Sequence, residues 1–267
     1  MTTGRLGVNS WMSAIEAYRR ALVALILRDI KTRFFGSAWG FLIAIAWPLS
    51  HIVILLVINT AIGRLPPYGD SSALWFATGV VPFMIFSYVS RLMIYGIMLN
   101  RPLLIFPTIR FMDILIARVV VEVLSAGVVI LILITFFTAE GIDFTPFNIP
   151  QAYFAIGASI LLGVGLGAIN AIIAQAIPMW ATGYSLSMIA LWGASGVAFI
   201  PDNLPEFARY ILSFNPALQI VSSMRAAYYE GYGSLTYDET YMMSFAVVSL
   251  FAGLLLERFA RGRLLQG

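Results

Sequence analysis

The sequence predicts an all-α polytopic membrane protein with six transmembrane helices and both termini in the cytoplasm. Three observations lead to this fold class: 60% of the 267 residues are hydrophobic, only 11% are charged, and the charged residues leave long uncharged runs between them. A soluble domain carries about 25% charged residues and could not hide so much apolar surface from water. The composition therefore excludes a soluble globular protein and favours a chain surrounded by lipid.

The uncharged runs supply six segments of the length that a bilayer requires, which is about 20 mostly apolar residues. The run between Asp143 and Asp202 is too long for one span and is divided near Pro178. Because the runs are continuous rather than alternating every second residue, strands are disfavoured. We expect one transmembrane domain covering 1–267, with spans at about 39–63, 72–96, 114–138, 152–175, 180–200 and 240–257.

The basic residues set the expected orientation. With the N-terminus placed in the cytoplasm, eleven Lys and Arg residues fall in inner segments and three in outer ones. Cytoplasmic segments of membrane proteins are enriched in Lys and Arg, so both ends of the chain are expected inside.

The N-terminal segment 11–35 is expected to form an amphipathic helix along the cytoplasmic interface. Trp11, Ile15 and Tyr18 recur at helical spacing on one face. The helix ends in a charged cluster that suits either anchoring to anionic lipids or contact with a cytoplasmic partner. This cluster consists of Arg28, Asp29, Lys31 and Arg33.

The inner segment 97–113, between the second and third spans, is longer than a plain connector of two to eight residues. Two prolines punctuate it, and it can hold a short helix with exposed apolar side chains. These features predict a docking element for a partner. Its candidate residues are Pro102, Leu103, Leu104, Ile105, Phe106, Pro107 and Arg110.

The outer segment 201–232 reads as two short helices separated by Asn215 and Pro216. Neither half is long or apolar enough to cross the bilayer. We expect a re-entrant helical hairpin before the last span, buried against protein because lipid cannot satisfy its broken backbone.

Several chemistries are missing from the sequence. There is no cysteine and only one histidine, His51, so no metal site is expected. The single lysine, Lys31, follows no glycine-rich loop, and the chain is not expected to hold ATP phosphates or any other cofactor itself.

Three ionisable side chains lie within the expected spans toward the inner side: Arg91, Arg118 and Glu122. Arg118 and Glu122 stand at i and i+4 and can neutralise each other, while Arg91 can reach the inner headgroups. The alternative is that they line the path of an anionic substrate.

Aromatic side chains of the second and fifth spans form a second group of candidates for that path. Aromatic faces stack on sugar rings, but the same residues also serve as membrane-interface anchors or core. The candidates are Trp75, Phe83, Phe86, Tyr88, Trp180, Tyr184 and Trp192. Gly163, Gly165 and Gly167 in the fourth span suit close packing between helices.

With this pattern, the sequence resembles the membrane subunits of type-2 ABC exporters, and within them the capsular-polysaccharide exporters. Three segments carry the resemblance: ALILRDIKTRFFGSAWGFLIAIAWPLSHIVIL (24–55), LNRPLLIFPTIRFMDILIARVVVEVL (99–124) and FNPALQIVSSMRAAYYEGYG (214–233). They look like the interface helix running into the first span, the inner loop with its coupling helix, and the outer hairpin.

The resemblance implies a half-transporter without an ATPase site. Two copies would form the channel, and two cytoplasmic ATPase subunits would bind ATP and Mg. Residues 102–110 would dock on the ATPase, with 28–34 beside them. The substrate would be a lipid-linked capsular polysaccharide leaving across the inner membrane of a Gram-negative bacterium toward periplasmic and outer-membrane partners, with no nucleic acid involved.

Two alternatives stay open. An exporter of the same architecture could move O-antigen, teichoic acid, a lipid or a drug. A membrane-embedded glycosyltransferase or acyltransferase would need convergent acids or a His–acid site at one membrane face, and neither is visible in the sequence.

Overall fold

The computed structural model describes residues 3–33, 38–63, 65–106, 109–233 and 235–264, and these are helical with no strand among them. Four helices are long and apolar enough to cross a membrane: α3 (Ser72–Asn100) with the short helix that continues it, α4 (Phe111–Ala139), α5 (Ile149–Ala176) and α9 (Glu239–Leu264). The second, third, fourth and sixth predicted spans are therefore confirmed as helices of spanning length.

Of the other two predicted spans, the first is matched closely in length by a helix and the fifth is shorter in the structure. The first corresponds to α2 (Ala38–Ala61), whose apolar described part is Leu49–Asn59. The fifth corresponds to α6 (Trp180–Gly193), which has 14 residues and a length of about 21 Å, less than the roughly 30 Å of a hydrocarbon core. The predicted outer end at residue 200 is wrong, because the chain turns after Gly193 through Gly196, which has a φ of +78°. Six complete crossings stay a prediction.

The expected short elements are present. The helix α1 (Thr3–Arg33) begins earlier than predicted, and the inner segment holds the short 3₁₀ helix η1 (Arg101–Ile105). The outer segment contains η2 (Pro201–Asn203), α7 (Glu206–Ser213) and α8 (Pro216–Tyr228). The two predicted short helices are present, and the second is buried along most of its length. Their re-entry into the membrane stays a prediction.

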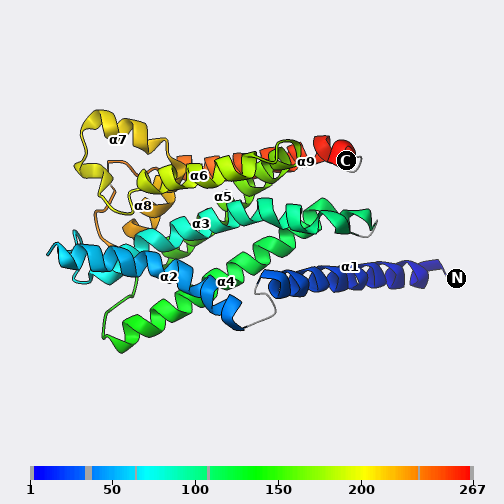
Figure 1. Cartoon of the computed structure of the whole chain (residues 1–267), viewed down its shortest axis with the longest axis horizontal. Helices are drawn as coiled ribbons and strands as arrows, with labels where there is room; N and C mark the ends of the chain where they lie inside the picture. The colour runs from blue at the N-terminus through cyan, green and yellow to red at the C-terminus, as the bar shows by residue number, and fades with distance from the viewer. Residues whose placement is uncertain (1–2, 34–37, 64, 107–108, 234, 265–267) are drawn as a thin grey trace.

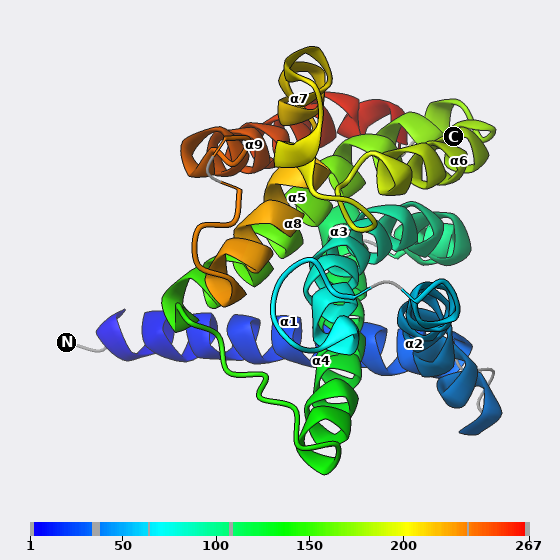
Figure 2. The same cartoon turned by 90° about the vertical axis from the view of Figure 1, so that its left-hand side faces the viewer.

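The elements expected on one side of the membrane lie at one end of the molecule. In Figure 1, α1, the end of α9 and the turn from α3 to α4 lie on the right, while α7 and α8 lie on the left. Figure 2, seen from the outer end, shows α1 running across the view, whereas α2, α3 and α6 point toward the viewer. In Figure 1, α1 also runs along the direction of α3 and α9, so it is inclined to the long helices, and its position along a membrane surface stays a prediction. The side of the membrane on which each end lies stays a prediction.

The helix α5 is the centre of the bundle and packs closely between α3 and α9 through its glycines. A Cβ on Gly163 would lie 2.9 Å from Val89 of α3, one on Gly167 would lie 2.6 Å from the Met93 sulfur, and one on Gly165 would lie 2.5 Å from a backbone nitrogen of α9. The predicted packing role of the three glycines is confirmed.

We expect Gly165→Ala to destabilise the protein by about 1–3 kcal/mol, because the added methyl group meets the backbone of α9, which cannot move as a side chain can. Thermal unfolding in detergent measures the effect. Gly157→Ala on the same helix is the matched control, since a Cβ there meets nothing within 4 Å. Equal melting temperatures for the two variants would contradict the packing interpretation.

Candidate functional site

A groove with a volume of about 550 Å³ lies between α2, α3 and α6. Its wall combines aromatic rings with hydroxyl groups and one guanidinium group. The lining residues are Trp47, His51, Phe83, Met84, Ser87, Tyr88, Arg91, Tyr95, Thr182, Ser185, Leu186, Met188, Ile189 and Trp192. Such a wall offers stacking faces and hydrogen-bond partners with little fixed charge.

Four of the predicted path residues line this groove, namely Phe83, Tyr88, Arg91 and Trp192. The Arg91 guanidinium lies 5.4 Å from the centre of the Tyr88 ring. Among the described residues, no carboxylate lies within ion-pair distance of Arg91. The groove therefore presents a cation that is available to an anionic group.

Three other predicted path residues pack elsewhere. Phe86 is fully buried behind Phe83, at 6.0 Å between ring centres. Tyr184 packs against the bundle core. Trp180 donates its indole N–H to the Asn170 side chain at 2.7 Å, which fixes the start of α6 against the end of α5.

Trp75, another predicted path residue, belongs to a cluster at the outer end of the bundle. Its ring is 2% exposed, and the Arg225 guanidinium carbon lies 3.7 Å from the ring centre. The rings of Tyr68, Tyr229 and Tyr232 lie 5.5–5.8 Å from Trp75, so a cage of four aromatic rings encloses this end of α8. Trp75 packs inside this cluster and does not line the groove, so its role in a substrate path stays a prediction.

Arg225 is one of the three basic residues that the sequence places in outer segments, and it is completely buried. Its guanidinium donates to the carbonyls of Gly196 and Val197 at 2.6 and 2.7 Å and to the Tyr232 hydroxyl at 3.2 Å. We call Arg225 and these contacts the outer clamp. It ties α8 to the turn that follows α6.

A buried charge cluster joins α1 to α4. Arg118 Nη1 donates to both carboxylate oxygens of Asp29 at 2.9 Å, and Nε lies 3.3 Å from Glu122. The side chains of all three are at most 7% exposed. Gly96 of α3 leaves room for the Arg118 stem, because a Cβ there would lie 3.2 Å from Arg118 Cγ. The predicted Arg118–Glu122 pair is confirmed, and Asp29 is a further partner.

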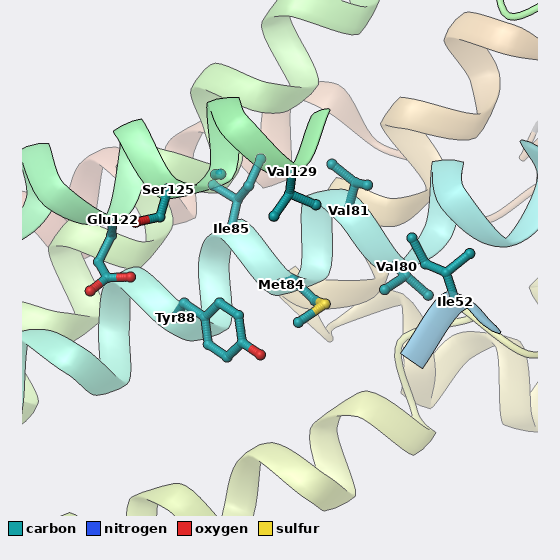
Figure 3. A pocket seen from close by; sticks show the side chains of 10 residues that line it. Ile52, Val80, Val81, Met84, Ile85, Tyr88, Glu122, Ser125 and Val129 are labelled. Atoms are coloured by element: carbon teal, nitrogen blue, oxygen red, sulfur yellow. The ribbon is translucent and has the colours of Figure 1, made fainter. Parts of the chain in front are cut away.

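Arg118 and Glu122 do not line the groove. Glu122 instead points, with Tyr88, into one end of a narrow cavity of about 40 Å³ between α2, α3 and α4 (Figure 3). The rest of this cavity is lined by apolar side chains and Ser125. Tyr88 contributes to both spaces, since it lines the cavity and the groove.

The predicted docking segment presents a small apolar tip. Ile105 is 82% exposed and Phe106 57%, while Leu104 packs against the inner core and Leu103 is half-buried. Pro102 is exposed, Pro107 lies outside the described residues, and the Arg110 N–H donates to Asp113 at 2.8 Å to cap α4. The exposed candidates thus reduce to Ile105 and Phe106, with Pro102 and Arg110 beside them.

The predicted cluster on α1 is divided between two environments. Asp29 is buried, whereas Arg28 and Lys31 are exposed, and the Arg33 side chain lies outside the described residues. Farther along α1, partial burial and the neighbouring Asp113 carboxylate raise the pKa of Tyr18. Contact between Tyr18 and Asp113 places α1 beside the beginning of α4.

These features define a multi-pass helical membrane protein with a polar, aromatic groove and no nucleotide-binding motif, which is the composition of a membrane transport subunit. No established family profile matches the chain. Comparison with individual proteins places it nevertheless: the chain belongs to the family of capsule polysaccharide export inner-membrane proteins. It is accordingly a protein of the bacterial inner membrane.

Three relatives illustrate the similarity. The chain is 30% identical to the polysialic acid transport protein KpsM of Escherichia coli over 249 residues, which cover 92% of this chain and 95% of that protein. It is 23% identical to the capsule polysaccharide export inner-membrane protein CtrC of Neisseria meningitidis, with 95% and 96% covered. It is 28% identical to BexB of Haemophilus influenzae, which has the same description, with 89% and 88% covered.

Proposed function

We propose that the protein is the membrane subunit of an ATP-driven exporter that moves a lipid-linked capsular polysaccharide across the inner membrane. The observation that carries this proposal is the similarity to capsule and polysialic acid exporters along nearly the whole chain. Two copies of the chain pair to form the channel, and two cytoplasmic ATPase subunits bind ATP and Mg. Periplasmic and outer-membrane partners receive the polymer.

The groove supports this function by its chemistry. Rings such as Trp47, Phe83 and Trp192 offer stacking surfaces to sugars, and the Arg91 guanidinium offers one charged contact to an acidic polymer. A wall of weak contacts with a single cation lets a polymer advance without being held at one position. The relatives described above are named for polysialic acid transport or capsule polysaccharide export, which favours a capsular polymer over O-antigen, teichoic acid or a drug.

We expect Arg91→Met to lower export several-fold while leaving the amount of protein in the membrane unchanged, because Arg91 faces the groove and has no ion-pair partner among the described residues. Arg91→Lys keeps the charge and retains most of the export. The measurement compares polysaccharide at the cell surface with polysaccharide retained inside. Normal export by Arg91→Met would remove Arg91 from the substrate path.

The test of ATPase docking uses the exposed tip. We expect Ile105→Ser combined with Phe106→Ser to abolish most co-purification of the ATPase and most export, because these apolar side chains stand in solvent unless a partner covers them. The fold should tolerate both changes, since exposed positions alter stability by about 0.5 kcal/mol or less.

Leu65→Ser is the matched control, since Leu65 is an 88% exposed apolar residue at the outer end of the molecule. This variant should leave both the co-purification of the ATPase and the export unchanged. If the tip variant still binds the ATPase and exports normally, the docking proposal is wrong. A protein that transports without any ATPase would overturn the proposed function as a whole.

A further inference from the structure

A second large cavity, of about 330 Å³, lies at the outer end of the bundle, away from the groove. Its walls come from α3, α4, α5 and α8, and the loop between α4 and α5 covers its outer end with Phe144 and Pro146. Figure 2 shows the outer ends of α4 and α5 well separated and joined by this loop. The cavity is therefore an opening between two spans that the protein itself leaves unfilled.

The lining is almost entirely apolar. Leu133 and Phe137 come from α4, Ala152 and Ile156 from α5, and Met224 from α8. Of the few polar groups, the Thr78 hydroxyl donates to its own helix at 2.9 Å. Water finds too few partners in such a space, and apolar cavities of this kind stay dry and accept apolar ligands.

The surroundings identify the source of that ligand. Only 22% of the most apolar window of α4 is buried, and the exposed side chains beside the cavity are apolar or aromatic, including Phe136, Ile149 and Tyr153. In an inner-membrane protein, such a face is in contact with lipid chains. The cavity is continuous with this lipid-facing surface and lies in the half of the spans next to the outer loops.

The charges near the mouth restrict the headgroup. Glu140 and Asp143 are exposed in the loop that covers the cavity, and hydrogen bonds from Thr145 hold the pKa of Asp143 below its usual value. The chain has no Arg or Lys from 119 to 208, and Arg225 of α8 is enclosed by the outer clamp. The mouth therefore attracts an ammonium group and repels an anionic headgroup.

We propose that this cavity is a binding site for one acyl chain of a phospholipid with an ammonium headgroup, phosphatidylethanolamine, in the outer-loop half of the bilayer. The lipid completes the packing between α4, α5 and α8 that the side chains leave open. This site is separate from the groove and adds a ligand that the transport proposal does not require.

The test is native mass spectrometry of the full-length protein. The protein in detergent is mixed with equal amounts of phosphatidylethanolamine and phosphatidylglycerol, and the detergent is removed before the bound lipid is measured. We expect retained phosphatidylethanolamine in excess over phosphatidylglycerol. Ala152→Trp fills the cavity and should lower the retention several-fold. Gly157→Trp, on the same helix but facing open space, is the control and should retain lipid as the natural chain does.

A second measurement keeps the test valid if Ala152→Trp fails to fold. A phosphatidylethanolamine with a photoreactive acyl chain should label 130–137 and 149–156 of the natural chain more strongly than the lipid-facing residues 247–255 of α9. Equal labelling of these regions, equal lipid retention by both tryptophan variants, or retention of phosphatidylglycerol at least as strongly would overturn the proposal.

Discussion

Replacing Arg225 by methionine is expected to destabilise the protein by about 3 kcal/mol or more and to lower its abundance in the membrane. The change removes the stacking on Trp75 and leaves the carbonyls of Gly196 and Val197 buried without their donor. A desolvated cation–π contact contributes about 2 kcal/mol, and each buried unsatisfied group costs about 1–3 kcal/mol. Thermal unfolding in detergent and membrane abundance measure the loss.

Arg209→Met is the matched control, because Arg209 is a partly exposed guanidinium in the same hairpin with one long contact, 3.5 Å, to the Asp202 carbonyl. It should change the melting temperature little. The melting temperature of Arg225→Lys should fall between those of Arg225→Met and Arg209→Met. A lysine keeps the charge but cannot donate to both carbonyls and also stack on the Trp75 ring. If Arg225→Met unfolds at the same temperature as the natural chain, the outer clamp does not hold the hairpin.

The second large effect concerns Arg118. We expect Arg118→Ala to cost about 3–5 kcal/mol, because it removes the contacts of 2.9 Å and 3.3 Å that the guanidinium makes with the buried carboxylates of Asp29 and Glu122. Loss of abundance alone would not separate a structural role from a role in transport. A variant that neutralises the whole cluster makes that separation.

The triple variant Asp29→Asn, Arg118→Met, Glu122→Gln removes all three charges of the cluster, and replacing a whole buried ion pair or triad is often nearly neutral for stability. We expect its abundance to approach that of the natural chain while export falls several-fold, because the Asp29–Arg118 link between α1 and α4 is lost. Export that recovers in proportion to abundance would show that the cluster serves stability alone.

Some parts of this architecture follow from sequence because they depend on local composition. The uncharged runs identify α3, α4, α5 and α9, Pro178 marks the break between α5 and α6, and the spacing of Arg118 and Glu122 predicts their pair. Each of these signals is carried by residues close together in the chain, where helix geometry fixes the relation between them.

Other parts depend on residues far apart in sequence. Asp29 reaches Arg118 across 89 positions, and the Arg225 contacts to Gly196 and Val197 span nearly thirty. Because helix spacing says nothing about such pairs, the sequence places Arg225 among the outer charges and Trp75 among the candidates for the substrate path, whereas the two side chains stack on each other. One signal was available: an arginine among the aromatic residues of 225–232 is a candidate for a stacked, buried cation.

The position of the Arg118–Asp29 bond along α4 has a mechanical consequence. The helix is one unbroken element from residue 111 to residue 139 and contains no proline, whereas α3 contains Pro82. Arg118 stands about 10 Å from the inner end of α4 and about 32 Å from its outer end. If α4 tilts about this bond as a stiff lever, a displacement produced beside Phe106 is about three times larger at the far end.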